Sequence, residues 1–129
     1  MSFKKRRAAW LRGRFGEALA AWWLRFKGYR ILARDYRTPV GEIDLVARRG
    51  RVLAVIEVKA RPRIEQAAEA VSVRQRRRIE RAAEVFLQRH PGLVGCELRF
   101  DALLISPYQR PRHIIGAWRD ARGAGINKH

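Results

Sequence analysis

The chain has 129 residues, which suits one domain with a real core and is too short for two ordinary ones. Lysine and arginine number 29 against 12 aspartate and glutamate residues, and the net charge of +17 makes nucleic acid the expected partner, with a merely arginine-biased composition as the alternative. A single cysteine excludes an intramolecular disulfide or multi-cysteine zinc site, and no apolar run is long enough to span a bilayer, so we expect a cytoplasmic, soluble protein.

Helical periodicity predicts a first helix over residues 4–27, ended by Gly28. One face carries large apolar side chains and the opposite face small ones, and periodicity does not decide which face meets a sheet. A first strand follows over residues 29–37 and ends before Pro39.

The most informative segment is a hairpin of strands over residues 42–48 and 52–59. If Gly50 and Arg51 are the central residues of its turn, Asp44 lies opposite Glu57. Glu42 then lies opposite Lys59, so three carboxylates and an amine share one face. The same register matches apolar residues on the other face, which supports it. These matches are Ile43 with Val58, Leu45 with Ile56, and Ala47 with Ala54.

A polar connection over residues 64–71 precedes a second helix. Ser72 followed by Gln75 forms a capping box, which predicts a helix from Val73 to Arg89. Two more strands are expected over residues 97–105 and 112–118. The order α-β-β-β-α-β-β predicts an α/β fold with a mixed β-sheet of about five strands flanked by helices. We expect a single domain over residues 1–118 and a basic tail over 119–129.

The charged face of the hairpin predicts a metal site. Asp44 directly opposite Glu57 is destabilising unless a cation lies between them, and Mg²⁺ or Mn²⁺ prefers such oxygen ligands. Lys59 lies on the same face as Glu57, where its ammonium can orient a phosphate or a water. On spacing alone, a surface ion-pair network is the simpler explanation; the hairpin register and the positive charge of the chain favour the metal site instead.

Four short motifs, in order and spacing, give this chain a specific resemblance: Gly16-Glu17, Gly41-Glu42-Ile43-Asp44, Glu57-Val58-Lys59 and Arg99-Phe100-Asp101. Together they resemble the YraN family of small bacterial proteins, within the PD-(D/E)xK nuclease superfamily. The resemblance extends over residues 13–105. It implies a restriction-endonuclease-like fold in which Asp44 and Glu57 bind the metal and Lys59 serves catalysis. It also implies Glu17 as a further catalytic and metal-binding carboxylate, and Glu42 as a partner of Lys59 or of a metal-bound water.

Other residues of the resemblance keep two interpretations. The chain has Arg74-Gln75 where the resemblance leads us to expect a lysine, and Ala60 where we expect a threonine. Gln75 is explained by helix capping or as a second-shell group of the site. Asp101 either supports the site in the same way or forms a buried pair with an arginine.

Basic residues before and within the second helix are the candidate phosphate contacts, or else a solvated helix face. They are Arg61, Arg63, Arg74, Arg76, Arg77 and Arg78. The expected function is metal-dependent hydrolysis of nucleic acid, with DNA processing by an endonuclease as its specific form. One alternative to this function is a non-catalytic nucleic-acid-binding module of the same fold. Another is that the first helix binds a membrane surface or a partner. The oligomeric state is left open, a homodimer included.

Overall fold

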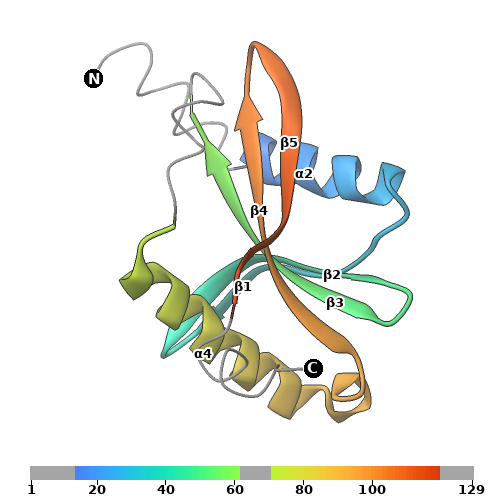
Figure 1. Cartoon of the computed structure of the whole chain (residues 1–129), viewed down its shortest axis with the longest axis vertical. Helices are drawn as coiled ribbons and strands as arrows, with labels where there is room; N and C mark the ends of the chain where they lie inside the picture. Colours follow the sequence, from blue (N-terminus) through green and yellow to red (C-terminus); the bar gives the residue numbers. More distant parts are fainter. Residues whose placement is uncertain (1–13, 62–70, 120–129) are drawn as a thin grey trace.

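The structure is a computed structural model that describes residues 14–61 and 71–119 (Figure 1). Its elements are α2 (Arg14–Phe26), β1 (Arg30–Thr38), β2 (Gly41–Arg49), β3 (Val52–Ala60), α4 (Val73–Arg89), the 3₁₀ turn η1 (Pro91–Leu93), β4 (Glu97–Ser106) and β5 (Gln109–Trp118). This order confirms the predicted α/β architecture. The beginning of the predicted first helix, most of the connection before α4, and nearly all of the predicted tail lie outside the described residues.

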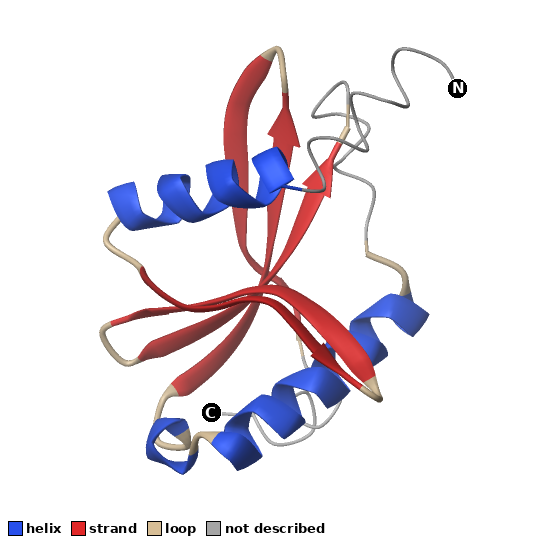
Figure 2. Cartoon of the chain, turned by 180° about the vertical axis from the view of Figure 1, so that it is seen from behind, coloured by secondary structure: helices blue, strands red, loops and turns tan. Residues whose placement is uncertain are grey.

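The strands of the described part form one five-stranded mixed sheet in the order β1-β2-β3-β4-β5. β3 and β4 are parallel, and the other neighbours are antiparallel. Parallel neighbours need a crossover connection, and α4 lies on that connection. Figure 2 shows α2 and α4 on opposite sides of the twisted sheet. Neither of these two described helices is long and apolar enough to cross a membrane.

Helix α2 meets the sheet through its small residues. Ala20, Ala21 and Leu24 are fully buried, whereas Trp22 and Phe26 are 67% and 87% exposed. Small side chains let the helix axis come close to the strands, and Leu24 fills the space that remains. The structure therefore settles which face is covered, and it leaves Trp22 and Phe26 on the surface while Trp23 packs against the core under α2.

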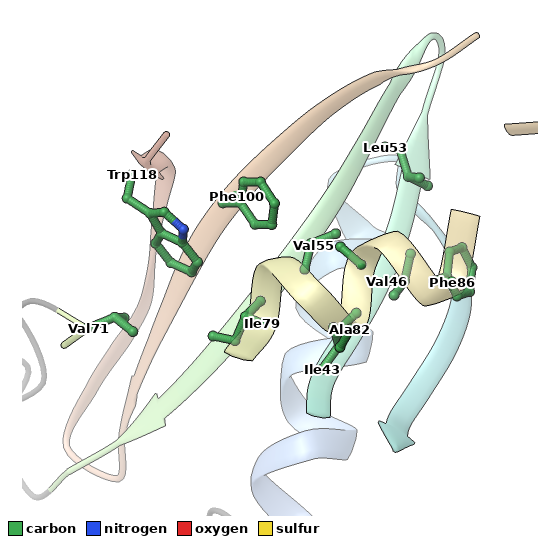
Figure 3. Packing of buried hydrophobic residues seen from close by; sticks show 11 residues of the cluster. Ile43, Val46, Leu53, Val55, Val71, Ile79, Ala82, Phe86, Phe100 and Trp118 are labelled. Atoms are coloured by element: carbon green, nitrogen blue, oxygen red, sulfur yellow. The ribbon is translucent and has the colours of Figure 1, made fainter. Parts of the chain in front are cut away.

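Helix α4 has the predicted bounds and the predicted cap. The hydroxyl of Ser72 accepts a hydrogen bond from the backbone amide of Gln75 at 3.1 Å. The predicted apolar stripe is buried and packs on one face of the sheet (Figure 3). On the helix this stripe comprises Ile79, Ala82, Ala83 and Phe86, and on β2 and β3 it meets Ile43, Val46, Leu53 and Val55.

The hairpin has the predicted register, but only over part of its length. Backbone pairs run from Arg49 with Val52 to Leu45 with Ile56, which leaves Gly50 and Arg51 in the turn. Beyond Leu45 the two strands part: β2 continues beside β1, and β3 continues beside β4 (Figure 1). We call this point the strand fork. The predicted backbone pairing of Asp44 with Glu57 is therefore wrong, because the twisted sheet divides there.

The prediction of one apolar and one charged hairpin face is also wrong over the paired length. Val46 and Val55 are buried under α4, while Leu45 and Ile56 belong to the cluster under α2. Both faces are apolar because a helix covers each of them. Charged side chains gather at the strand fork, beyond the last pair.

Gly41 begins β2 against the backbone of α4. A Cβ atom at this position would clash with the carbonyl group of Arg78. The absence of a side chain thus lets the second turn of α4 lie directly on the start of β2. This contact fixes α4 relative to the residues of the fork.

Candidate active site

Asp44 lies at the strand fork, where its side chain replaces the backbone of β2 as a hydrogen-bond partner of β3. Its Oδ2 atom accepts a hydrogen bond from the backbone amide of Val58 at 2.8 Å. Burial raises the pKa of Asp44 above its usual value, although the Val58 amide and a hydrogen bond with the Glu57 carboxyl both act to lower it. Asp44 and Glu57 are therefore side-chain neighbours, even though their backbones do not pair.

Gln75 connects Glu57 with Lys59. Its Nε2 atom donates to Oε2 of Glu57 at 2.6 Å, and its Oε1 atom accepts from Nζ of Lys59 at 3.2 Å. The Lys59 ammonium lies 4.0 Å from the same Glu57 oxygen, and the side chains of Lys59 and Glu57 are only 18% and 11% exposed. Of the two interpretations of Gln75, the site-facing one is therefore found: the Ser72 hydroxyl caps α4 by accepting from the Gln75 backbone amide, while the Gln75 side chain enters the site.

Glu17 approaches from the first turn of α2. Nε of Arg34 donates to it at 3.3 Å. Burial raises the pKa of Glu17, the charge of Asp35 raises it further, and Arg34 opposes both; the charge of Asp44 also raises it. Glu17 therefore shares the electrostatic environment of Asp44, while the hydrogen bond found for it in the described part is to Arg34.

Asp35 is a neighbour that the sequence analysis missed. It lies between the pairs Arg34 with Leu45 and Tyr36 with Ile43, and so beside Asp44 on β2. Its backbone has a φ of 49°, uncommon for a residue with a side chain, and its charge raises the pKa of both Glu17 and Asp44. Extending the register through a turn at Pro39-Val40 would have placed Asp35 opposite Asp44.

Glu42 does not lie opposite Lys59. It pairs with Arg37 of β1 instead, because the first residues of β2 belong to the β1–β2 ladder, and it is exposed. The charge of Glu42 still reaches the site, since it contributes to the raised pKa of Asp44. The predicted link from Glu42 to Lys59 is thus corrected.

Asp101 lies in a separate buried network. It is 0% exposed and accepts two hydrogen bonds from Arg99, at 2.9 Å each. His113 and the backbone amide of Gly116 bind the same carboxylate at 2.8 and 2.9 Å. Of the two interpretations of Asp101, the buried arginine pair is the one found, and none of these four bonds connects it with Asp44, Glu57 or Lys59.

The predicted phosphate-contacting arginines have different surroundings. Arg74, Arg77 and Arg78 are exposed along the first turns of α4. Arg76 instead donates to the carbonyl of Val71 at 2.8 Å, and its guanidinium lies 6.0 Å from the ring centre of Trp118. A further hydrogen bond joins Arg61 to the carbonyl of Ala60 at 2.8 Å. Arg63 lies outside the described residues.

The chemistry of the donors at the fork fits a hard divalent cation. Asp44 and Glu57 offer carboxylate oxygens that are in contact and mostly buried, an arrangement that a cation stabilises. Among residues 14–61 and 71–119, no group of three or more histidine, cysteine, aspartate or glutamate side chains is arranged to hold a metal. Two protein carboxylates with water at the other positions is a common set for Mg²⁺.

Fold and site together define an α/β protein whose sheet divides at a partly buried pair of carboxylates next to a lysine. The chain belongs to the uncharacterised protein family UPF0102, whose family model matches residues 16–105. This confirms the resemblance to the YraN family.

Relatives in this family match most of the chain. A UPF0102 protein of Paramagnetospirillum magneticum is 50% identical over 87% of this chain and 90% of its own length. Another, from Parvibaculum lavamentivorans, is 55% identical over 87% of this chain and 84% of its own. A third, from Rhodopseudomonas palustris, is 53% identical over 88% of each. Their names give the family and no activity.

Proposed function

We propose that this protein is a metal-dependent nuclease that hydrolyses phosphodiester bonds in nucleic acid, with DNA as the first substrate to test. The observation that carries the proposal is the pair of neighbouring carboxylates at the strand fork beside Lys59, Glu57 buried and Asp44 half-buried. Such a pair is costly to keep in a fold unless it binds something positive.

Each residue of the fork has a distinct part in this proposal. Asp44 and Glu57 would hold Mg²⁺ or Mn²⁺, which when bound lowers the pKa of a water and stabilises charge on the phosphate. Lys59 would donate a hydrogen bond to a phosphate oxygen or orient the attacking water. Glu17 would add negative charge from α2, where its environment is already coupled to that of Asp44.

The charge of the chain supports a polyanionic substrate. A net charge of +17 attracts nucleic acid over long range. Arg74, Arg77 and Arg78 are exposed at the beginning of α4, the helix from which Gln75 enters the site. Phosphates bound there would lie near the positive end of the helix dipole as well as the guanidinium groups.

A second candidate is a non-catalytic nucleic-acid-binding module of the same fold. It is favoured by one specific observation: Lys59, Gln75 and Glu57 already form a connected set of hydrogen bonds. In that case the charges serve folding, and the arginines alone serve function.

A cleavage screen separates these two functions. Wild type, Asp44→Ala and Lys59→Ala are incubated with single-stranded, duplex, flap and four-way DNA, with Mg²⁺ or Mn²⁺. The nuclease proposal predicts cleavage by wild type and its loss in both variants, with folding and DNA affinity largely retained. Cleavage that is unchanged in both variants contradicts the proposal, and DNA binding without cleavage by wild type favours the binding module.

A further inference from the structure

We infer that Gln75 is a positioning residue of this site, which holds Lys59 away from Glu57 so that the carboxylate stays available to a cation. This inference rests on the proposed function and adds to it a residue that acts through its neighbours. It is carried by the two hydrogen bonds of the Gln75 amide and by the separation of the two groups that it connects.

The amide of Gln75 has a donor end and an acceptor end, and the site uses each of them. Nε2 donates to Glu57 at 2.6 Å, and Oε1 accepts from Lys59 at 3.2 Å. A turned amide would face the ammonium with its own donors and the carboxylate with its own oxygen. Only one orientation therefore fits, and it requires a donor at Lys59 and an accepting oxygen at Glu57.

The amide also acts as a spacer. With Gln75 between them, the Lys59 nitrogen and the Glu57 oxygen are 4.0 Å apart, at the outer limit of an ion pair and beyond direct hydrogen-bond distance. Without the amide, the ammonium could close on the carboxylate in this mostly buried setting. A direct pair would neutralise Glu57 and compete with a metal ion for it.

The position of Gln75 is itself fixed from two directions. The Ser72 hydroxyl accepts from its backbone amide at 3.1 Å and holds the first turn of α4. One turn later, Gly41 lies directly against the backbone of Arg78, which sets the distance between α4 and the sheet. The amide is therefore presented to the fork by a rigid element, as a positioning group must be.

The test compares Gln75→Met, which keeps the length and volume of the side chain without its amide, with wild type. Mn²⁺ affinity is measured by calorimetry on the full chain, and cleavage is followed in parallel. We expect Mn²⁺ affinity to fall by about 10- to 100-fold, the range found when a hydrogen bond to a metal ligand is removed. We expect kcat to fall with it, while KM for DNA changes by less than about twofold.

Two further variants separate positioning from stability. Gln88→Ala, on the exposed side of the same helix, should match wild type in both measurements. Leu87→Ala, near the other end of α4 and packed against the core cluster, should lower the melting temperature while Mn²⁺ affinity stays within about threefold. Equal weakening of Mn²⁺ binding by Leu87→Ala and Gln75→Met would assign a merely structural role to Gln75.

The outcomes distinguish this inference from the proposed function. If wild type binds Mn²⁺ and Gln75→Met binds it equally well, the inference on Gln75 is overturned and the nuclease proposal stands. If wild type binds no Mn²⁺ at millimolar concentration, the proposed function fails and the inference fails with it.

Discussion

Asp44 is half-buried next to a second carboxylate, and desolvation disfavours its charged form in the folded chain. Its raised pKa means that the folded state holds the proton more tightly than the unfolded state does. Stability therefore falls as pH rises from the ordinary aspartate pKa through the raised one, and the full cost is present above it. A residue that destabilises its own fold at neutral pH is expected at a functional site.

We predict that Asp44→Asn is more stable than wild type at neutral pH without metal, by on the order of 1 kcal/mol. The asparagine oxygen can still accept from Val58, and the buried charge is gone. Thermal melts in EDTA measure this difference. Mg²⁺ should raise the melting temperature of wild type but not that of the variant, and a variant that is less stable in EDTA would contradict this explanation.

Asp101 has the opposite relation to pH. Burial acts to raise its pKa, but the hydrogen bonds from His113 and Arg99 outweigh burial and lower it. Its contribution to stability is therefore complete above the ordinary aspartate pKa and is lost as pH falls through the lowered one. The hydrogen bonds of Asp101 join β4 to β5 at a register shift, where Asp101 accepts a hydrogen bond from the backbone amide of Gly116.

We predict that Asp101→Asn lowers the free energy of unfolding by about 3 kcal/mol at pH 7, because it removes the charge that Arg99 faces. Denaturant titrations of wild type and variant over a range of pH measure the difference. It should narrow as pH falls below the ordinary aspartate pKa, because the unfolded chain then takes up a proton that the folded carboxylate, with its lowered pKa, does not. A difference that stays constant down to pH 2 would contradict this assignment.

At the scale of elements, the contact between β2 and α4 has a direct test. Gly41→Ala places a methyl group against the carbonyl of Arg78, so we expect a loss of about 1–3 kcal/mol as the helix shifts. Gly92→Ala in η1 is the matched control, because a Cβ atom there meets nothing within 4 Å. Chemical denaturation measures both. Equal stability of the two variants would show that α4 is not held closely at Gly41.

Much of the fold could be predicted because local rules and burial agree. Apolar matching and the Gly50 turn fix the hairpin register, and the Ser72 cap fixes where α4 begins. The strand fork could not be predicted in this way, since a register assumes that the two strands stay together. The covered face of α2 was equally undecided, because small and large apolar residues can each meet a sheet.

The sequence predicted which residues form the candidate site better than it predicted the hydrogen bonds between them. Asp44, Glu57 and Lys59 follow from spacing on two strands, and their side chains do gather at the fork. The link through Gln75 depends on how α4 packs over β3, which spacing does not reveal. Asp35 lies on β1, which the hairpin register does not reach, because that register relates β2 only to β3.

For the whole molecule, the charge of +17 predicts strongly salt-dependent binding of nucleic acid. If Arg77 and Arg78 contact phosphates, replacing both with glutamine should reduce the slope of log affinity against log salt concentration by about 1 to 2. Fluorescence anisotropy at several salt concentrations measures this slope. Arg51→Gln, in the exposed hairpin turn, is the control for a general loss of charge.

The salt-dependence slopes of these variants also show which surface contacts the nucleic acid. A reduced slope for the α4 double variant, with an almost unchanged slope for Arg51→Gln, assigns the phosphate contacts to the start of α4. A reduction for Arg51→Gln that is half that of the double variant, in proportion to the charge removed, would mean that binding follows net charge alone. The arginines of α4 would then have no special part in it.

Asp44 and Glu57 are proposed to hold a divalent cation together, a claim that direct measurement of Mn²⁺ binding tests best. Electron paramagnetic resonance of free Mn²⁺ reports how much of the ion the chain takes up, independently of any cleavage. We predict saturable binding by wild type at micromolar to millimolar Mn²⁺, and its loss in Glu57→Gln. The absence of saturable binding by wild type, or equal binding by Glu57→Gln, would contradict the claim.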